Sequence, residues 1–299
     1  SDEPNAFSKK PVWARFAVVA AGPLSNFLWA FLAALVVLAI AGVNPARVTY
    51  LQDGYGAEQA GLQVGDIITE INGKNIAIGR DIDLYFLNHP LDGSTLTITY
   101  ERDGQEYTTL LDPNYTTYRM GITYLVTEEA ASFTEVAAGS PAEAAGIQVG
   151  DVVVSVNGTP VATGQEMADY MESHPLDGSP IELVLERNGE QFTATLTPEL
   201  YQGVALGFEA SVYREKAGVL GVLGGSVQEV RYWISACFSS LKMLFTGQAG
   251  IQDMSGPVGI VSMIGTTVEQ SRQDGALYVF LNMMNMFILL SANLGVFNL

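Results

Sequence analysis

The chain has 299 residues, 48% of them apolar, and its 32 acidic against 14 basic residues give a net charge of −18. Binding to nucleic-acid phosphates requires clustered Lys and Arg, so this charge balance excludes a nucleic-acid partner. The single cysteine, Cys237, cannot form an internal disulfide, and the redox compartment therefore stays open.

The first predicted element is a membrane helix over residues 13–42, preceded by a lead-in over residues 1–12. Its apolar run has no charge and is longer than the roughly 20 residues that a helix needs to cross a bilayer. A signal peptide is the weaker alternative, because the run is too long for one. Basic residues precede the run, so the lead-in is expected in the cytoplasm and the middle of the chain outside it.

Polar and helix-bending residues interrupt this first span in the stretch AGPLSN, which contains Gly22, Pro23 and Asn26. Gly and Pro permit a kink and the close approach of another helix, and Asn26 can hydrogen-bond a neighbouring helix. Polar residues inside a membrane are candidates for functional sites. A purely structural packing role remains an equal alternative.

The middle of the chain is a tandem repeat. AGLQVGDIITEING at residues 60–73 recurs as AGIQVGDVVVSVNG at residues 145–158, an offset of 85 residues. Each copy alternates apolar and polar residues before an Asn-Gly turn, which predicts strands and hairpins with two short helices. The two histidines, His89 and His174, occupy the same repeat position, so they are explained by the repeat and no metal site is predicted.

The repeat resembles PDZ domains of the permuted bacterial type, whose hallmark is a GSPAxxAG segment followed by Gly-Asp. The second copy matches from Gly139 to Asp151, whereas the first has Tyr55 and Gly56 in place of Ser-Pro. The expected boundaries are 43–121 for the first PDZ domain and 122–212 for the second.

A PDZ domain binds an extended peptide as an added strand, often with the terminal carboxylate in a nest of backbone amides. Two stretches, RMGI and ALGF, are candidates for that nest. The candidate peptide-binding residues are Arg119, Gly121, Ile122, Gly207 and Phe208. The alternative is that both stretches are ordinary strand starts, and the sequence leaves open which strand pairs with which copy.

Residues 213–272 are predicted to form a juxtamembrane amphipathic segment. Its part from 217 to 245 places apolar residues on one helical face beside basic and aromatic ones. This helix either lies on the membrane surface or packs under the second repeat copy.

The last predicted element is a second membrane helix, residues 273–299, which is uncharged from Ala276 onward. Asn282 and Asn285 are expected to be hydrogen-bonding links between helices. Asn293 and Asn298 lie near its end.

The order of these parts resembles the site-2 protease family (M50-type) of intramembrane zinc metalloproteases, in the bacterial tandem-PDZ branch that includes the regulator of sigma-E protease, RseP. The stretches AGPLSN, GSPAEAAGIQVGD, MSGPVGI and NLGVFNL carry this resemblance. It implies zinc as cofactor, bound through HExxH and LDG motifs that this sequence lacks. The chain is therefore expected to be an internal fragment and inactive alone, with no catalytic residue of its own.

The predicted fold is thus membrane α-helical spans flanking two tandem α+β PDZ domains. By resemblance, Asn298 and Asn293 bind the backbone of an unwound substrate helix. The implied function is regulated intramembrane proteolysis in the cell membrane, with extracytoplasmic PDZ domains that filter single-span substrates such as anti-sigma factors. The partners are such a membrane protein and membrane lipid. A non-catalytic, membrane-anchored tandem-PDZ adaptor is the alternative.

Overall fold

The structure is a computed structural model that describes residues 10–248, 257–272 and 275–298. Most of the expected lead-in, residues 1–9, and the beginning of the MSGPVGI stretch, residues 254–256, lie outside the described residues. The chain forms two compact units. The first joins Ser1–Pro113 to Leu206–Leu299, and the second is Asn114–Ala205. This division differs from the expected boundaries at 121 and 212.

Helix α1 (Val12–Ala41) is the first candidate span. Pro23 lies inside it and lacks a backbone N–H, while the Ser25 hydroxyl donates to the Gly22 carbonyl at 2.7 Å. The helix ends at Gly42, whose φ of +97° is a conformation that other residues rarely adopt. Small side chains, Ala30 and Ala34 among them, let a neighbouring helix come close.

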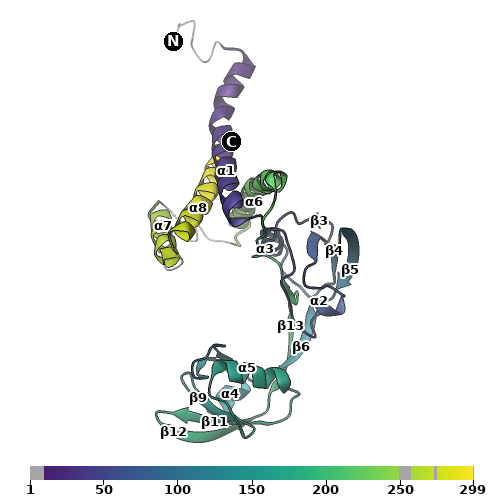
Figure 1. The fold of residues 1–299 in the computed structure, drawn as a ribbon, viewed down its shortest axis with the longest axis vertical. Coiled ribbons are helices and arrows are strands. Elements are labelled where there is room, and N and C mark those ends of the chain that lie inside the picture. The colour runs from purple at the N-terminus through teal and green to yellow at the C-terminus, as the bar shows by residue number, and fades with distance from the viewer. Residues whose placement is uncertain (1–9, 249–256, 273–274, 299) are drawn as a thin grey trace. The chain divides into compact units, whose positions relative to one another are not determined.

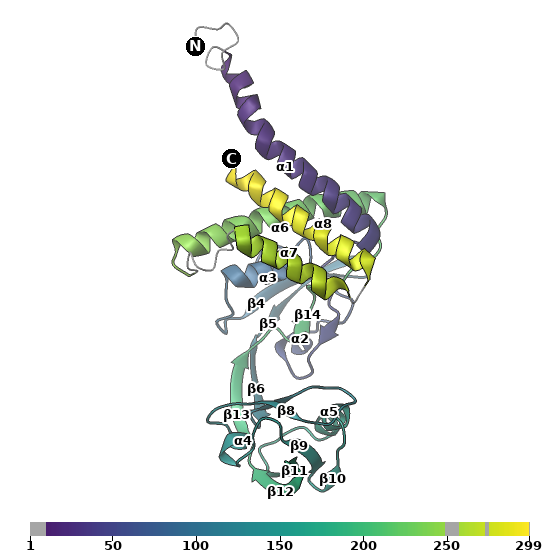
Figure 2. The ribbon, with the colours of Figure 1, turned by 90° about the vertical axis from the view of Figure 1, so that its left-hand side faces the viewer.

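Three further helices gather with α1 in the first unit (Figures 1 and 2). They are α6 (Val219–Phe245), α7 (Pro257–Arg272) and α8 (Ala276–Phe297). Two of them, α6 and α8, contact α1, and α7 contacts α8. Of these, α8 is long and apolar enough to cross a membrane. Asn282 on α8 donates to the Ser271 hydroxyl on α7 at 2.7 Å, which is the interhelical link expected of it.

The β part of the first unit is a four-stranded antiparallel sheet in the order β3-β2-β4-β5. Its elements are α2 (Gly56–Gln59), β2 (Ile67–Ile71), β3 (Lys74–Asn75), α3 (Arg80–Asn88), β4 (Leu96–Arg102) and β5 (Gln105–Leu111). A separate pair joins β1 (Tyr50–Leu51) to β14 (Phe208–Glu209). Because β14 follows the whole second unit in sequence, the second repeat copy is inserted into the first.

The second unit repeats this plan within one continuous segment. Its sheet has the order β10-β9-β11-β12. Its elements are β6 (Asn114–Arg119), β7 (Ile122–Tyr124), β8 (Phe133–Val136), α4 (Pro141–Ala144), β9 (Val152–Val156), β10 (Thr159–Pro160), α5 (Gly164–Ser173), β11 (Ile181–Arg187), β12 (Glu190–Leu196) and β13 (Glu199–Val204). Strand β7 pairs with β8, and β6 pairs with β13. Buried Phe133, Met167 and Leu183 lie in its core.

The Gly-Asp of the repeated motif has the same role in each unit. Asp151 accepts the Gln148 backbone N–H at 2.8 Å and pairs with Arg187 at 2.6 Å. In the first unit, Asp66 pairs with Arg102 at 2.7 Å. Both carboxylates are 1% exposed. Each ion pair joins the loop after the short helix to the end of a central strand.

Candidate functional site

Two glycine loops precede the short strands β14 and β7. Gly207 and Gly121 have φ of +76° and +81°, the left-handed region that favours glycine. A Cβ added to Gly207 would lie 2.5 Å from the Tyr55 Cβ, and one added to Gly121 would lie 2.2 Å from the Ser140 Cβ. Both loops therefore require glycine for conformation and for space.

Equivalent backbone hydrogen bonds hold the two loops. Gln52 donates to the Gly207 carbonyl at 2.9 Å in the first unit, and Ala137 donates to the Gly121 carbonyl at 2.8 Å in the second. The structure thus assigns Phe208 with Gly207 to the first unit, and Ile122 with Gly121 to the second. The sequence had left that assignment open.

Arg119, the remaining candidate in these loops, is engaged by tyrosines of the β6–β13 ribbon. Its guanidinium donates to the Tyr115 hydroxyl at 2.7 Å and lies 3.5 Å from the centre of the Tyr201 ring. A ligand at the Gly121 loop would have to compete with these contacts to bind this cation.

A groove runs between α3 and the segment around β14 in the first unit. Its pocket encloses about 370 Å³ and is lined by Ile82 and Asp83 from α3, by Leu206 and by residues 208–212. Among the strands of residues 10–248, 257–272 and 275–298, β14 pairs only with β1, so its other edge has no partner strand there. An unpaired strand edge beside an apolar wall is the geometry that accepts an extended peptide.

The second unit has a pocket of about 420 Å³ in a different place, between α4 and the segment joining β12 to β13. Its wall includes Ser140 and Pro141 of the repeated motif. Since Ser140 also contacts Gly121, this pocket lies beside the glycine loop of that unit.

The end of α8 packs closely on α1. A Cβ added to Gly295 would lie 2.4 Å from a carbon of the Phe27 ring, so the glycine admits that ring. Asn293, half-buried two residues earlier, has a buried side-chain oxygen without a hydrogen-bond partner among the described residues. Asn298 is exposed and follows the helix end, where its backbone N–H donates to the Leu294 carbonyl.

The other candidates on α1 differ in surroundings. Pro23 is buried, Asn26 is half-buried, and Gly22 is exposed with no atom within 4 Å of an added Cβ. Phe27, the next residue after AGPLSN, makes the close contact instead. Sequence reasoning missed Phe27, although the Gly in NLGVFNL signalled a close helix approach.

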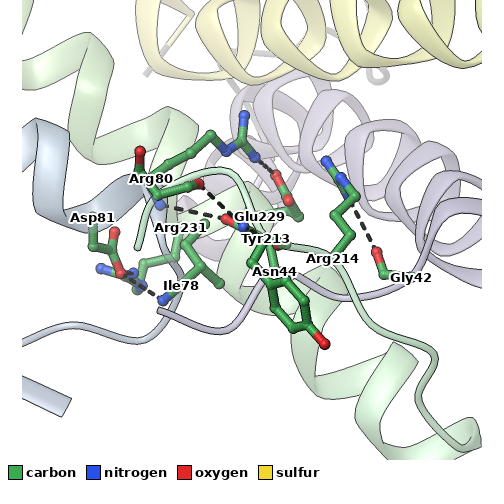
Figure 3. Close-up of polar contacts among 10 residues, drawn as sticks. Gly42, Asn44, Ile78, Arg80, Asp81, Tyr213, Arg214, Glu229 and Arg231 are labelled. Carbon is green, nitrogen blue, oxygen red and sulfur yellow. Dashed lines mark hydrogen bonds and ion pairs between the residues drawn. The ribbon is translucent and has the colours of Figure 1, made fainter. Parts of the chain in front are cut away.

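A polar cluster that the sequence did not predict joins α3 to α6 (Figure 3). Arg80 pairs with Glu229, which is 3% exposed, and Arg231 pairs with Asp81. Nearby Arg214 donates to the Gly42 carbonyl at 2.9 Å, and burial lowers the pKa of its guanidinium. The two ion pairs fix α6 against α3, and the Arg214 bond holds the segment before α6 to the end of α1.

The described residues do not fit a zinc centre. Within residues 10–248, 257–272 and 275–298, no group of three or more His, Cys, Asp or Glu side chains could hold a metal ion. His89 and His174 are exposed and stack on Tyr85 and Tyr170, as their shared repeat position predicts.

Comparison with known proteins extends over the whole chain. The sequence pattern of peptidase family M50 matches residues 1–299. A putative zinc metalloprotease of Vibrio cholerae is 31% identical over 98% of this chain and 69% of its own length. The regulator of sigma-E protease RseP of Salmonella typhimurium is 26% identical over 99% of this chain and 69% of its own. The zinc metalloprotease RasP of Geobacillus kaustophilus is 34% identical over 53% of this chain and 36% of its own.

Solved PDZ domains are similar to parts of the structure. The HtrA3 PDZ domain with a phage-derived ligand has a TM-score of 0.26 and 26% identity, covering 30% of this chain and 92% of that domain. The PDZ domain of a carboxy-terminal protease from Vibrio cholerae has a TM-score of 0.24 and 18% identity, covering 29% and 98%. The family match over all 299 residues decides the relationship, and the chain belongs to peptidase family M50, whose relatives here are named zinc metalloproteases.

Proposed function

We propose that this chain forms the substrate-handling part of an intramembrane zinc protease that carries out regulated proteolysis of single-span membrane proteins. Membership of peptidase family M50 supports the reaction class. The names of the relatives, zinc metalloprotease and regulator of sigma-E protease, support zinc as the cofactor and anti-sigma factors as the substrate class. Zinc would supply an activated water when bound, and no residue described here is assigned to hold it.

The junction of α8 with α1 is the observation that carries the proposal. Gly295 brings α8 onto Phe27, and Asn293 beside it keeps a buried oxygen without a partner among the described residues. A substrate helix that unwinds in lipid exposes backbone N–H groups, each of which costs several kcal/mol if unpaired. The Asn293 oxygen can accept one such N–H, and the exposed Asn298 can serve a second.

Both repeat copies are proposed to be PDZ domains of the permuted type, the second inserted into the first. The pairing of β14 with β1 and the matching contacts of Gly207 and Gly121 support this. On the outer side of the membrane, such a pair would exclude substrates that still carry a folded outer domain. Membrane lipid would surround α1 and α8, whose exposed apolar side chains, including Leu24 and Phe287, would otherwise contact water.

A cleavage assay in proteoliposomes tests the proposal. The full-length protein as its host produces it, zinc included, is reconstituted with a single-span substrate truncated on its outer side. Asn293→Ala and Asn298→Ala are each expected to slow cleavage about tenfold or more, because each removes a hydrogen-bonding partner of the unwound strand. Asn285→Ala, on the same helix, is the matched control and is expected to leave the rate within about twofold.

Two outcomes would contradict the proposal. Equal rates for all three variants would remove the substrate-binding role of the helix end. Binding of the substrate without any cleavage would favour the adaptor instead. Equal thermal stability of the variants ensures that a slower rate does not report misfolding.

A further inference from the structure

The two units differ in charge at positions that match in the repeat, on α3 and β14 in the first unit and on α5 and β7 in the second. Asp83 of α3 lies in the groove of the first unit, and Ala168 takes its place in the repeat. Glu209 of β14 lines the same groove, and Thr123 of β7 takes its place, since both follow the glycine loop by two residues. The first groove therefore carries two carboxylates at positions where the second unit has uncharged side chains.

The negative charge of these two carboxylates is incompletely neutralised within the protein. Asp83 accepts a hydrogen bond from the uncharged Ser211 side chain. Arg80, whose charge acts on Asp83, is itself paired with Glu229 and stacks over the Tyr232 ring at 4.5 Å. No ion pair to Asp83 or Glu209 exists among the described residues. Burial raises the pKa of Asp83, which agrees with an ionised form that lacks a full partner.

Apolar surface and an unpaired backbone edge complete this groove. Phe208 is 9% exposed at the base of the groove, and Val212 is 79% exposed at its margin. The edge of β14 that faces away from β1 offers backbone groups to an added strand. An extended peptide could thus place apolar side chains on Phe208 while a long basic side chain reached the carboxylates.

We propose that the first groove selects an extended peptide carrying a Lys or Arg side chain, which it binds between Asp83 and Glu209. The matching face of the second unit, between α5 and β7, lacks this preference. The inference rests on the proposed function of the first groove as a peptide-binding site. The two repeat copies would then bind different ligands, and a substrate would need a basic residue only in the segment that reaches the first groove.

Fluorescence anisotropy with labelled peptides tests this inference. The probes are fluorescein-labelled octapeptides of Val and Ser in which one Lys is moved along the chain, each matched by Gln and Glu versions. The full chain is used in nonionic micelles. The best Lys probe is expected to bind about five- to tenfold tighter than its Gln match, the range for two partly exposed ion pairs. This advantage is expected to shrink as salt rises.

Variants locate the preference. Asp83→Asn together with Glu209→Gln is expected to equalise the Lys and Gln probes, whereas Glu106→Gln on the exposed strand β5 is the matched control and is expected to change nothing. Ala168→Asp together with Thr123→Glu is expected to create a second site with the same preference for Lys.

The outcomes separate this inference from the proposed function. The charge preference would be overturned if the Lys and Gln probes bound equally to the unaltered chain. Peptide binding at the groove would still stand if neither probe bound to Gly207→Ala. No binding by any probe would overturn both. A Lys preference that persists in the double variant of Asp83 and Glu209 would place it elsewhere and overturn the assignment.

Discussion

Arg231 on α6 donates to the carboxylate of Asp81 in the first turn of α3, and the same carboxylate accepts the backbone N–H groups of Ala77 and Ile78 at 2.9 and 3.1 Å. Asp81 is 5% exposed. One buried carboxylate therefore holds the start of α3 and attaches it to α6. The helix that forms one wall of the first groove is fixed in this way to the helix that packs on the candidate membrane spans.

Removing the Asp81 charge is expected to loosen α6. In Asp81→Asn the Arg231 side chain, which is 40% exposed, loses its anionic partner but keeps access to water, so the cost is about 1 kcal/mol. Cys237 on α6 is the only cysteine and is 7% exposed, and burial raises the pKa of its thiol, so it reacts slowly with maleimide. Labelling in the variant is expected to be several-fold faster.

The pair Arg47–Glu215 provides the control for this experiment, because its side chains are 29% and 33% exposed. Exposed pairs contribute little to stability, so Glu215→Gln is expected to leave Cys237 labelling nearly unchanged. Equal labelling of Asp81→Asn and the unaltered protein would show that the Asp81–Arg231 pair does not hold α6.

The contact between Gly295 and Phe27 predicts a size limit at the helix junction. In Gly295→Ala the new methyl group would overlap the ring, and such overpacking costs about 1–3 kcal/mol. Gly22→Ala is the matched control on α1: it has open space, and a gain of about 0.5–1 kcal/mol in helix propensity is expected.

Thermal unfolding of the full chain in micelles measures both changes. Gly295→Ala is expected to lower the midpoint, and the added substitution Phe27→Ala is expected to recover part of the loss by removing the ring. A midpoint that is unchanged in Gly295→Ala would mean that α1 and α8 do not pack through this pair.

Local sequence patterns predicted much of the fold. The apolar runs predicted α1 and α8 within a few residues, and the repeated Asn-Gly and Asp-Gly turns have positive φ at Asn72 and Asp103, as a tight hairpin requires. These features depend on neighbours in sequence. The repeat offset also placed equivalent residues correctly, as the two Asp–Arg pairs of the units illustrate.

The pairing of β14 with β1 could not be predicted, because about 160 residues separate the two strands and nothing local specifies the partner. The same is true of the Arg80–Glu229 contact, which joins residues far apart in the chain. Gly207 and Gly121 were named as candidates from the ALGF and RMGI stretches, and their role in peptide binding stays a prediction. Phe27 and Asp83 were missed because their contacts depend on how whole elements pack.

The contact of Gly121 with Ser140 predicts that alanine destabilises the second unit more at Gly121 than at Gly139, although both glycines have a left-handed backbone. Gly121→Ala combines a strained φ of +81° with overlap on Ser140, whereas Gly139→Ala has a φ of +76° but open space. Strain alone costs roughly 1 kcal/mol, and the overlap adds to it. Hydrogen exchange at Phe133–Val136, the partner strand of β7, is expected to accelerate more in Gly121→Ala. Equal acceleration would mean that the Ser140 contact is unimportant.

The ion pair of Asp151 with Arg187 predicts how the second unit responds to acid. Burial alone would raise the pKa of Asp151, but hydrogen bonds from the Arg187 side chain and the Gln148 backbone, together with the Arg187 charge, outweigh it and lower that pKa. A carboxylate with a depressed folded-state pKa contributes stability above its unfolded value of about 3.9, and this contribution is lost as pH falls through the lower folded value. Asp151→Asn is therefore expected to accelerate hydrogen exchange in β11 at pH 7, and the difference from the unaltered chain is expected to shrink as the pH falls below about 4. Asp169→Asn, on the exposed face of α5, is the matched control. A difference that stays constant from pH 7 to pH 3 would mean that the ionised carboxylate does not stabilise this unit.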